Sequence, residues 1–435
     1  MTRPLPPFTF DELHFADLDQ VYQRGREEVL RDQVFSILLA RTDTVEKLEQ
    51  LVFAGEEGLA RWTRKELIEL SNRFRLLSSP ENEIRLYQEC QDEDFRRAPR
   101  VREFYVLALN KVGRPTEAIH EASRLIAEGG RNALLWGTLG EAYSAKMRFA
   151  EELAAVLRKA NDEPSRLDPR LIARCAGHFP AIDPGEMSVA RARALRAENL
   201  AAAIRMYHHG FCESGSSFTG LGWLLRMIDR LADLIIERGQ LGQTRANEGL
   251  GGDEALRLRL IDAEIETIEQ AVLSQVRLID FALTLQGGLE SLDYWTIAGI
   301  LLLAVVQGAD ELTLRNVLSR LLVTADADFK LATTLAELQR MGDQYAAMLD
   351  VEQAHGRDTA TLALRVQRAR WAVAECEAGR ARFKRTGSAN DAGFMPAPGD
   401  GPGGEPVRPL TAFLDKTINF FALTGSLVPV FIGGS

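Results

Sequence analysis

Apolar residues recur every three or four positions along most of the chain. In the stretch from 221 to 237, for example, Leu224, Leu225, Ile228, Leu231 and Ile235 fall on one side of a helix. This spacing is typical of helices that bury one face against a core. The run from 293 to 306 is almost wholly apolar but too short to cross a bilayer, so it predicts a buried helix. We therefore predict an all-α protein.

Residues that start and stop helices punctuate this pattern. Asp43 with Glu46, and Thr63 with Glu66, have the spacing of capping boxes, and Ser79-Pro80 favours a further helix start. We expect helices from about 15 to 97, then an irregular, proline-interrupted connector after residue 164. The predicted later elements are a helix from 188 to a break at Gly210, a turn at 214–217, a glycine-rich loop at 239–252, and helices at 253–285, 293–306, 314–321, 331–340 and 344–385.

A repeat organises the region from 102 to 164, which reads as two helix–turn–helix units. Trp136, Leu139, Gly140 and Tyr143 have the spacing of the first helix of a tetratricopeptide repeat, whose period is about 34 residues. A similar apolar face begins at Arg102, one period earlier. Trp295 and Gly299 repeat the signature later in the chain, and we expect both tryptophans to pack in the core. The pattern predicts a tetratricopeptide-like helical-repeat solenoid.

Changes of composition divide the chain into five segments. The expected segments are N-terminal degenerate repeats at 1–97, tetratricopeptide-like repeats at 98–180, a helical region at 188–385, a flexible Gly/Pro-rich linker at 386–409, and an apolar C-terminal tail at 410–435. No charged residue occurs from Thr417 onward, but Asn419, Gly425 and Pro429 dilute the apolar character. We expect this tail to dock on the solenoid or on a partner, with a membrane tether as the alternative.

Charge and cysteine content narrow the classes of function. The net charge of −10 argues against nucleic acid as the main partner, because phosphate binding needs a basic surface. The four cysteines lie far apart without CxxC spacing, which disfavours a disulfide framework or a zinc ribbon. The chain starts without an apolar targeting segment, so we expect a cytoplasmic protein.

Two short regions are candidates for ligand or partner binding. Arg205, Tyr207 and His208 lie near a predicted helix end, where they could face the inner groove of a solenoid; the alternative is that Tyr207 packs in the core. His208 and Cys212 are one helical turn apart, but a closed zinc site needs about four ligands, so we predict no metal.

The second candidate region consists of Gly249, Gly251 and Gly252, which precede a helix whose free N–H groups could hold a phosphate. The loop lacks the Lys-Ser/Thr of a P-loop and follows no strand, so a loop without a ligand is the alternative. No catalytic set of residues stands out, and we predict neither an enzyme nor a cofactor.

The order of several aromatic residues and glycines resembles the TRAFs-binding domain, the helical-repeat centre of the apoptosis-signal-regulating kinases and of related bacterial proteins. The residues that carry the resemblance are Tyr105, Leu109, Asn110, Arg114, Pro115, Trp136, Gly140, Tyr143, Tyr207, Gly210, Phe211, Gly220, Leu221, Gly222, Tyr294, Trp295, Ala325, Phe329 and Thr334. The similarity spans about residues 100–342. The chain has no kinase signature, so kinase activity is not implied.

The resemblance implies a scaffold or adaptor that binds a protein partner in signalling, with a bacterial conflict or defence system as one setting. Alternative functions are a sensor of a nucleotide-derived small molecule and a membrane-tethered adaptor.

Overall fold

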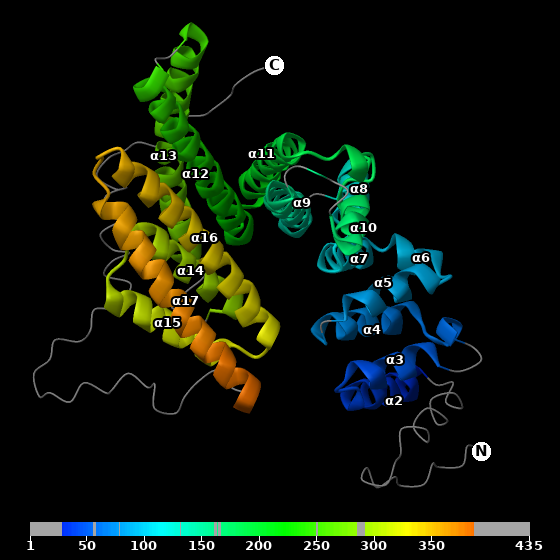
Figure 1. The fold of residues 1–435 in the computed structure, drawn as a ribbon. Helices are drawn as coiled ribbons and strands as arrows, with labels where there is room; N and C mark the ends of the chain where they lie inside the picture. Colours follow the sequence, from blue (N-terminus) through cyan, green and yellow to red (C-terminus); the bar gives the residue numbers. More distant parts are fainter. Residues whose placement is uncertain are drawn as a thin grey trace, which may run out of the picture. The chain divides into compact units, whose positions relative to one another are not determined.

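The computed structural model describes residues 28–54, 58–77, 79–130, 132–160, 163, 167–248, 251–284 and 292–386. These residues form sixteen α-helices, α2 to α17, two short 3-10 helices and no strand (Figure 1). The prediction of an all-α protein is therefore confirmed. The chain divides into two compact units, 1–199 and 200–435, and the division falls inside α11 (Val189–Ser214).

The first unit packs helices that follow one another in the chain. It contains α2 (Glu28–Arg41), α3 (Val45–Phe53), η1 (Gly58–Arg61), α4 (Arg64–Leu76), α5 (Pro80–Glu89), α6 (Glu93–Arg97), α7 (Pro99–Lys111), α8 (Pro115–Ala127), α9 (Ala133–Lys159), α10 (Pro169–His178), η3 (Pro184–Glu186) and the start of α11. Contacts join α4 to α5, α5 to α7, α7 to α8, and α8 to α9. Each of these helices is thus covered by its neighbours in sequence.

Side chains start these helices largely as the sequence indicates. Thr63 and Glu66 form the predicted capping box of α4, and Pro80 begins α5. The capping box predicted for Asp43 and Glu46 is wrong, because the N-cap of α3 is Thr44, whose hydroxyl accepts a hydrogen bond from the Lys47 N–H. Asp43 instead forms an ion pair with the Lys47 ammonium at 2.6 Å.

The second predicted helix–turn–helix unit does not exist. α7 and α8 form the first predicted helix–turn–helix unit, but α9 runs without interruption from Ala133 to Lys159. The physical reason lies between Tyr143 and Phe149, where no glycine or proline is present to end the helix. Phe149, Ala150 and Leu153 in the second half of α9 pack into a core with α10 and the start of α11.

The second unit contains the end of α11, α12 (Ser217–Glu248), α13 (Gly252–Thr284), α14 (Tyr294–Gln307), α15 (Glu311–Thr324), α16 (Asp328–Ala354) and α17 (Ala360–Thr386). α12 packs against α13 and α16, α14 packs against α15, and α16 packs along α17 (Figure 1). One continuous apolar core runs through all six complete helices.

Two predicted glycine breaks are helical in the structure. α11 continues past Gly210 and ends at Ser214, before Gly215 with its positive φ of 63°. α12 continues through Gly239 and Gly242, so the predicted loop at 239–252 is much shorter. A Cβ atom on Gly239 would lie 2.6 Å from Val351 Cγ1. This glycine therefore serves a close approach between α12 and α16 rather than a turn.

The predicted helix at 344–385 is two helices. α16 ends at Ala354, Gly356 takes a left-handed φ of 66°, and α17 begins at Ala360. The left-handed Gly308 and the N-cap Asp310 form the predicted turn between α14 and α15. Thr386, the first residue of the linker predicted at 386–409, is the last residue of α17; the rest of that linker and the tail predicted at 410–435 lie outside the described residues. The described helices include none with the length and hydropathy of a membrane span.

Candidate functional site

Of the three side chains predicted near the end of α11, Tyr207 is part of the core. It is buried, and its ring lies against Gly222 of α12, where an added Cβ would come within 2.4 Å of the ring. Arg205 and His208 are exposed. Tyr207 thus holds α11 to α12 and leaves the other two side chains for contact with solvent or a ligand.

His208 lies in a small cluster with Trp223 and Cys212. Its ring centroid is 4.4 Å from that of Trp223, and the Cys212 sulfur is 3.4 Å from His208 Nε2. Partial burial and the neighbouring His209 lower the pKa of His208, and partial burial raises the pKa of the Cys212 thiol. Within the described residues, no three His, Cys, Asp or Glu side chains gather as a metal site would require.

The predicted phosphate site is only partly visible, because Gly249 lies outside the described residues. Gly251 and Gly252 are exposed at the start of α13. The N–H of Gly251 donates a hydrogen bond of 3.2 Å to Glu254, and Asp253 lies in the same turn. Two carboxylates therefore already occupy the positive end of this helix, where a phosphate would be repelled.

The repeat-signature residues of α9 differ in burial. Leu139 and Gly140 are buried, whereas Trp136 and Tyr143 are half-buried. The prediction that Trp136 packs in the core is thus met only in part.

The expected core position of Trp295 is wrong. Its side chain is 45% exposed, and the neighbouring Tyr294 is buried instead, with its hydroxyl 2.9 Å from that of Thr334. The buried aromatic residue at the start of α14 is therefore Tyr294 and not Trp295. Gly299 is buried as expected, and an added Cβ would lie 2.4 Å from Leu221 Cδ1.

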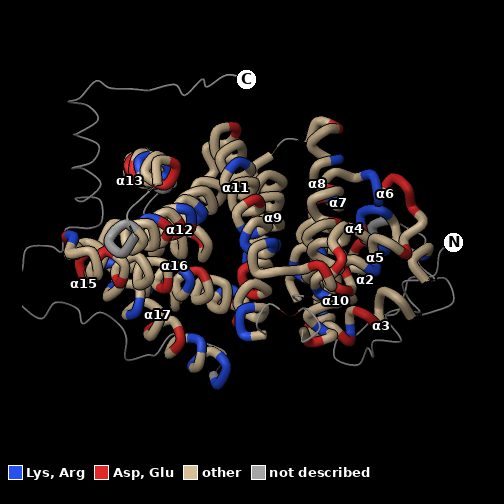
Figure 2. Tube along the Cα trace, turned by 45° about the horizontal axis from the view of Figure 1, so that its top comes forward, with Lys and Arg blue, Asp and Glu red and all other residues tan. Residues whose placement is uncertain are grey.

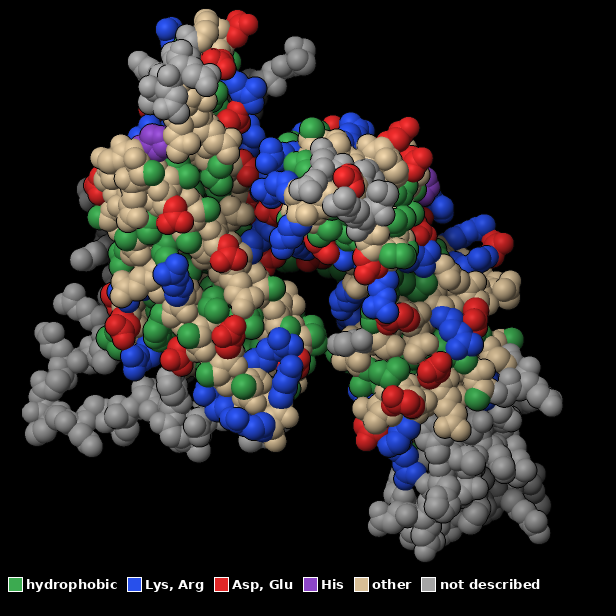
Figure 3. Space-filling view, viewed as in Figure 1, with side chains coloured by type: hydrophobic (Ala, Val, Ile, Leu, Met, Phe, Trp, Pro, Cys, Tyr) green, Lys and Arg blue, Asp and Glu red, His purple; other side chains and the backbone are tan. Residues whose placement is uncertain are grey.

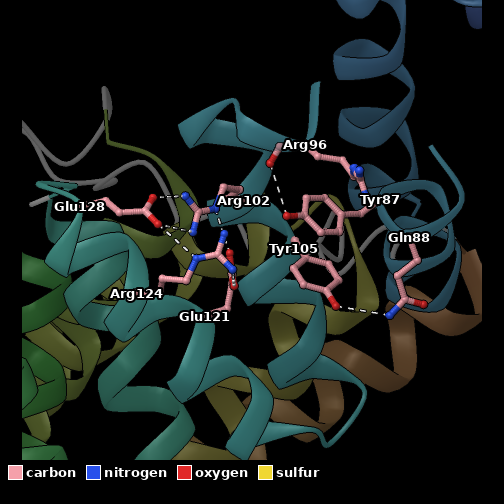
Figure 4. A network of polar contacts seen from close by, with 8 residues as sticks. All are labelled: Tyr87, Gln88, Arg96, Arg102, Tyr105, Glu121, Arg124 and Glu128. Atoms are coloured by element: carbon pink, nitrogen blue, oxygen red, sulfur yellow. Dashed lines mark hydrogen bonds and ion pairs between the residues drawn. The ribbon is translucent and has the colours of Figure 1, made fainter. Parts of the chain in front are cut away.

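A polar network ties α7 to α8 in the first unit (Figure 4). The buried Arg102 guanidinium donates to Glu121 at 2.8 Å and also contacts Glu128. Arg124 forms ion pairs with both carboxylates, at 3.6 Å and 3.1 Å. Hydrogen bonds to Arg102 and Arg124 lower the pKa of Glu128.

Two tyrosines lie beside this network. The rings of Tyr87 on α5 and Tyr105 on α7 stack with centroids 4.0 Å apart (Figure 4). Gln88 donates to the Tyr105 hydroxyl, and Tyr87 donates to the carbonyl of Arg96, each at 3.3 Å. The stack and the ion pairs fix α5, α7 and α8 to one another.

A second buried network joins α12 to α16, and no motif in the sequence predicts it. Arg226 contacts Asp229 at 3.0 Å and donates to Glu337 at 2.9 Å, while Arg340 donates to Asp229 at 3.0 Å. Arg226 and Asp229 are buried, and the carboxylates raise the pKa of Arg226 despite the opposing effect of burial. These contacts link the first half of α12 to the middle of α16.

α13 carries a second, uncharged face that is exposed among the described residues. Leu256, Leu260 and Leu278 are 57%, 62% and 48% exposed. Between them, at helical spacing, lie Ala263, Thr267, Ala271 and Ser274. The opposite side of α13 buries Ile261, Ile265, Ile268, Val272, Val276 and Ile279. Sequence reasoning missed the exposed face, although its spacing of three and four residues from 256 to 278 was available.

Basic residues gather at the end of α17 (Figures 2 and 3). Arg380 donates to both carboxylate oxygens of Asp328 on α16, at 2.7 Å and 2.9 Å, and Lys384 lies 4.0 Å from the same carboxylate. These contacts hold the pKa of Asp328 below its usual range. They align the end of α17 with the start of α16.

In comparisons with known proteins, no family model matches the chain and no curated protein gives a significant match.

Proposed function

We propose that the chain is a non-enzymatic helical scaffold whose second unit binds a partner protein through the outer face of α13. The observation that supports this is the uncharged, leucine-bearing stripe from Leu256 to Leu278. A surface helix of a soluble protein normally has one apolar stripe, which faces its own core. α13 has such a stripe and, in addition, an uncharged one that the described part of the unit leaves exposed.

An amphipathic helix of the partner fits this stripe best. Seven positions from 256 to 278, spaced three or four residues apart, form a nearly straight line along α13. The leucines lie at the two ends, and the residues in the middle are small. Small residues allow two helix backbones to approach closely, while the leucines at either end supply apolar area.

Charged residues border the stripe and would orient the partner helix. Arg257 and Glu264 lie along one edge, where each also forms an ion pair with α12. Arg259 and Glu266 are exposed along the other edge. Charges of both signs next to an apolar seam select a partner with the complementary sequence of charges.

The first unit supports the scaffold interpretation in a different way. α4, α5, α7 and α8 pack mainly on neighbours in sequence, as tetratricopeptide-like repeats do. With the resemblance to the TRAFs-binding domain, this arrangement favours a signalling adaptor in the cytoplasm. A bacterial conflict or defence system is the proposed setting.

The test compares matched leucine variants. Tagged wild-type protein is purified from its native cell, its stoichiometric partner is identified by mass spectrometry, and the partner is then purified and titrated. The double variant Leu256→Glu/Leu260→Glu should weaken binding by about 2 kcal/mol or more, roughly 30-fold in Kd. Leu312→Glu on α15, where Leu312 is 58% exposed, should bind like the wild type.

Two outcomes would contradict the proposal. A partner that binds the α13 and α15 variants equally well would place its site elsewhere. A homodimer that dissociates in the α13 variant, observed by light scattering, would mean that α13 pairs with a second copy of the chain.

A further inference from the structure

α17 is a basic helix in a protein that is acidic as a whole. It contains seven Arg or Lys residues and two Glu, whereas the chain has a net charge of −10. Its last two turns hold four of the basic residues, Arg380, Arg382, Lys384 and Arg385. They form part of the blue surface at the end of α17 (Figure 3). Positive charge that gathers on one element of an acidic protein indicates an anionic partner.

Two acidic side chains lie near these four cations and offset part of their charge. Asp328, at the start of α16, accepts hydrogen bonds from Arg380 and lies 4.0 Å from Lys384. Glu377 lies one turn before Arg380 on α17. The side chain of Lys384 is still 57% exposed, and Arg385 is exposed as well. The end of α17 therefore keeps positive charge in contact with solvent.

Aromatic side chains adjoin these cations at the start of α16. Phe329 follows Asp328 directly, and its ring centroid lies 6.3 Å from that of Trp295 at the start of α14. Trp295 is 45% exposed. An indole has an apolar ring and one N–H donor, and such side chains are enriched where a bilayer meets water. Aromatic and cationic groups thus lie on either side of the Asp328 carboxylate.

We propose that this surface binds an anionic lipid bilayer. The residues of this lipid-binding surface are Trp295, Phe329, Arg380, Arg382, Lys384 and Arg385. Lipid head groups would accept hydrogen bonds from Lys384 and Arg385, while Trp295 enters the interfacial layer. An acidic peptide would match the charge alone, whereas a bilayer supplies both a negative surface and an apolar layer. Binding of this kind needs no helix that spans the membrane.

The chain that follows α17 carries a second apolar signal in its sequence. Residues 417–435 contain no charged residue and include Phe420, Phe421 and Phe431. One weak signal gives only reversible membrane binding, and stable binding takes two, such as a basic patch with an apolar group. The order of these features along the chain favours a bilayer over an acidic protein as the partner.

The experiment is sedimentation of the purified full-length protein with lipid vesicles. Vesicles with about one-third phosphatidylserine should bind the wild type, and vesicles of phosphatidylcholine alone should bind it much less. Lys384→Gln/Arg385→Gln should lower the partition coefficient roughly 30-fold, because each basic residue near an anionic surface contributes about fivefold. Trp295→Ala should lower it several-fold. Binding should also weaken as salt is added.

The matched control is Arg191→Gln/Arg193→Gln, which makes the same change of charge at two exposed arginines of α11. It should bind like the wild type, and circular dichroism checks that every variant is folded. Equal binding by Lys384→Gln/Arg385→Gln and the wild type would overturn the proposal, as would equal binding to both kinds of vesicle. An acidic protein that is lost from the α17 variant, without any binding to vesicles, would also overturn it. The α13 stripe takes no part in this test.

Discussion

Glu83 is a single side chain that makes the stability of the first unit depend on pH. It is buried on α5, and the Ser71 hydroxyl donates a hydrogen bond of 3.4 Å to its carboxylate. Burial raises the pKa of Glu83 from 4.5 to about 7, against the opposing charges of Lys111 and Arg75. Between these two pH values the folded protein holds a proton that the unfolded chain releases. Stability therefore falls as the pH rises from 4.5 to 7, and stays reduced above 7.

Glu83→Gln removes the loss of stability that comes from ionising the buried carboxyl group. We expect the variant to be more stable than the wild type by roughly 3 kcal/mol at pH 8, with almost no difference at pH 4.5. Urea unfolding at the two pH values measures the difference. Glu81→Gln, in the exposed part of the same turn, should show no such dependence on pH. Equal stability of Glu83→Gln and wild type at pH 8 would show that Glu83 ionises without cost.

Gly222 tests the close contact between α11 and α12. In Gly222→Ala the new methyl would lie 2.4 Å from the Tyr207 ring, which is rigid and buried. Overpacking costs about 1–3 kcal/mol, and the better helix propensity of alanine returns about 1 kcal/mol. We expect a net loss of roughly 1 kcal/mol in chemical denaturation. Gly252→Ala, where nothing lies within 4 Å of the added methyl, should not destabilise the protein.

At the scale of elements, the ion pairs of Arg102 contribute to the packing of α7 against α8 and so to the free energy of unfolding. Arg102→Met would leave Glu121 almost buried without its guanidinium, and we expect a loss of about 3 kcal/mol. The double variant Arg102→Met/Glu121→Met should recover most of that loss, because no buried charge then remains. Breaking the exposed Arg97–Glu93 pair by Arg97→Ala should change stability by less than about 1 kcal/mol. A double variant as unstable as the single one would contradict this account.

Helix positions were predictable wherever a local chemical signal marks an end. Thr63 with Glu66, Pro80 and Gly308 all act within one turn of the backbone, and the structure agrees with each. The repeat pattern wrongly predicted a turn inside α9. A repeat implies a turn at that position even though no glycine or proline there ends the helix. The loop predicted to start at Gly239 was wrong for a different reason. In the sequence, a glycine that permits close helix packing cannot be told from one that permits a turn.

The candidate sites were less predictable, because they depend on contacts distant in sequence. Arg226 meets Glu337 across 111 positions, and nothing near either residue reveals the pair. Trp295 and Tyr294 are adjacent aromatics, and the packing of α14 against the rest of the unit decides which of the two is buried. The three- and four-residue spacing of the exposed stripe on α13 can be read in the sequence. Only the structure shows which of the two faces of this helix packs in the core.

For the whole molecule, the division into two units predicts two unfolding transitions. α11 contributes Ala192 and Leu195 to a core of the first unit, whereas Tyr207 on the same helix packs against Gly222 in the second. Units with separate cores need not unfold together, so calorimetry of the full chain should resolve two transitions. Glu83→Gln at pH 8 should raise the temperature of one, and Gly222→Ala should lower the temperature of the other.

The double variant decides between independent and coupled units. If the units are independent, Glu83→Gln/Gly222→Ala should shift each transition by the same amount as the corresponding single variant, because distant sites without shared partners are additive. α11 is the element most able to couple them, since it belongs to both. A single transition that both substitutions move would mean that this helix transmits unfolding from one core to the other. A ligand or partner bound to one unit would then also stabilise the second.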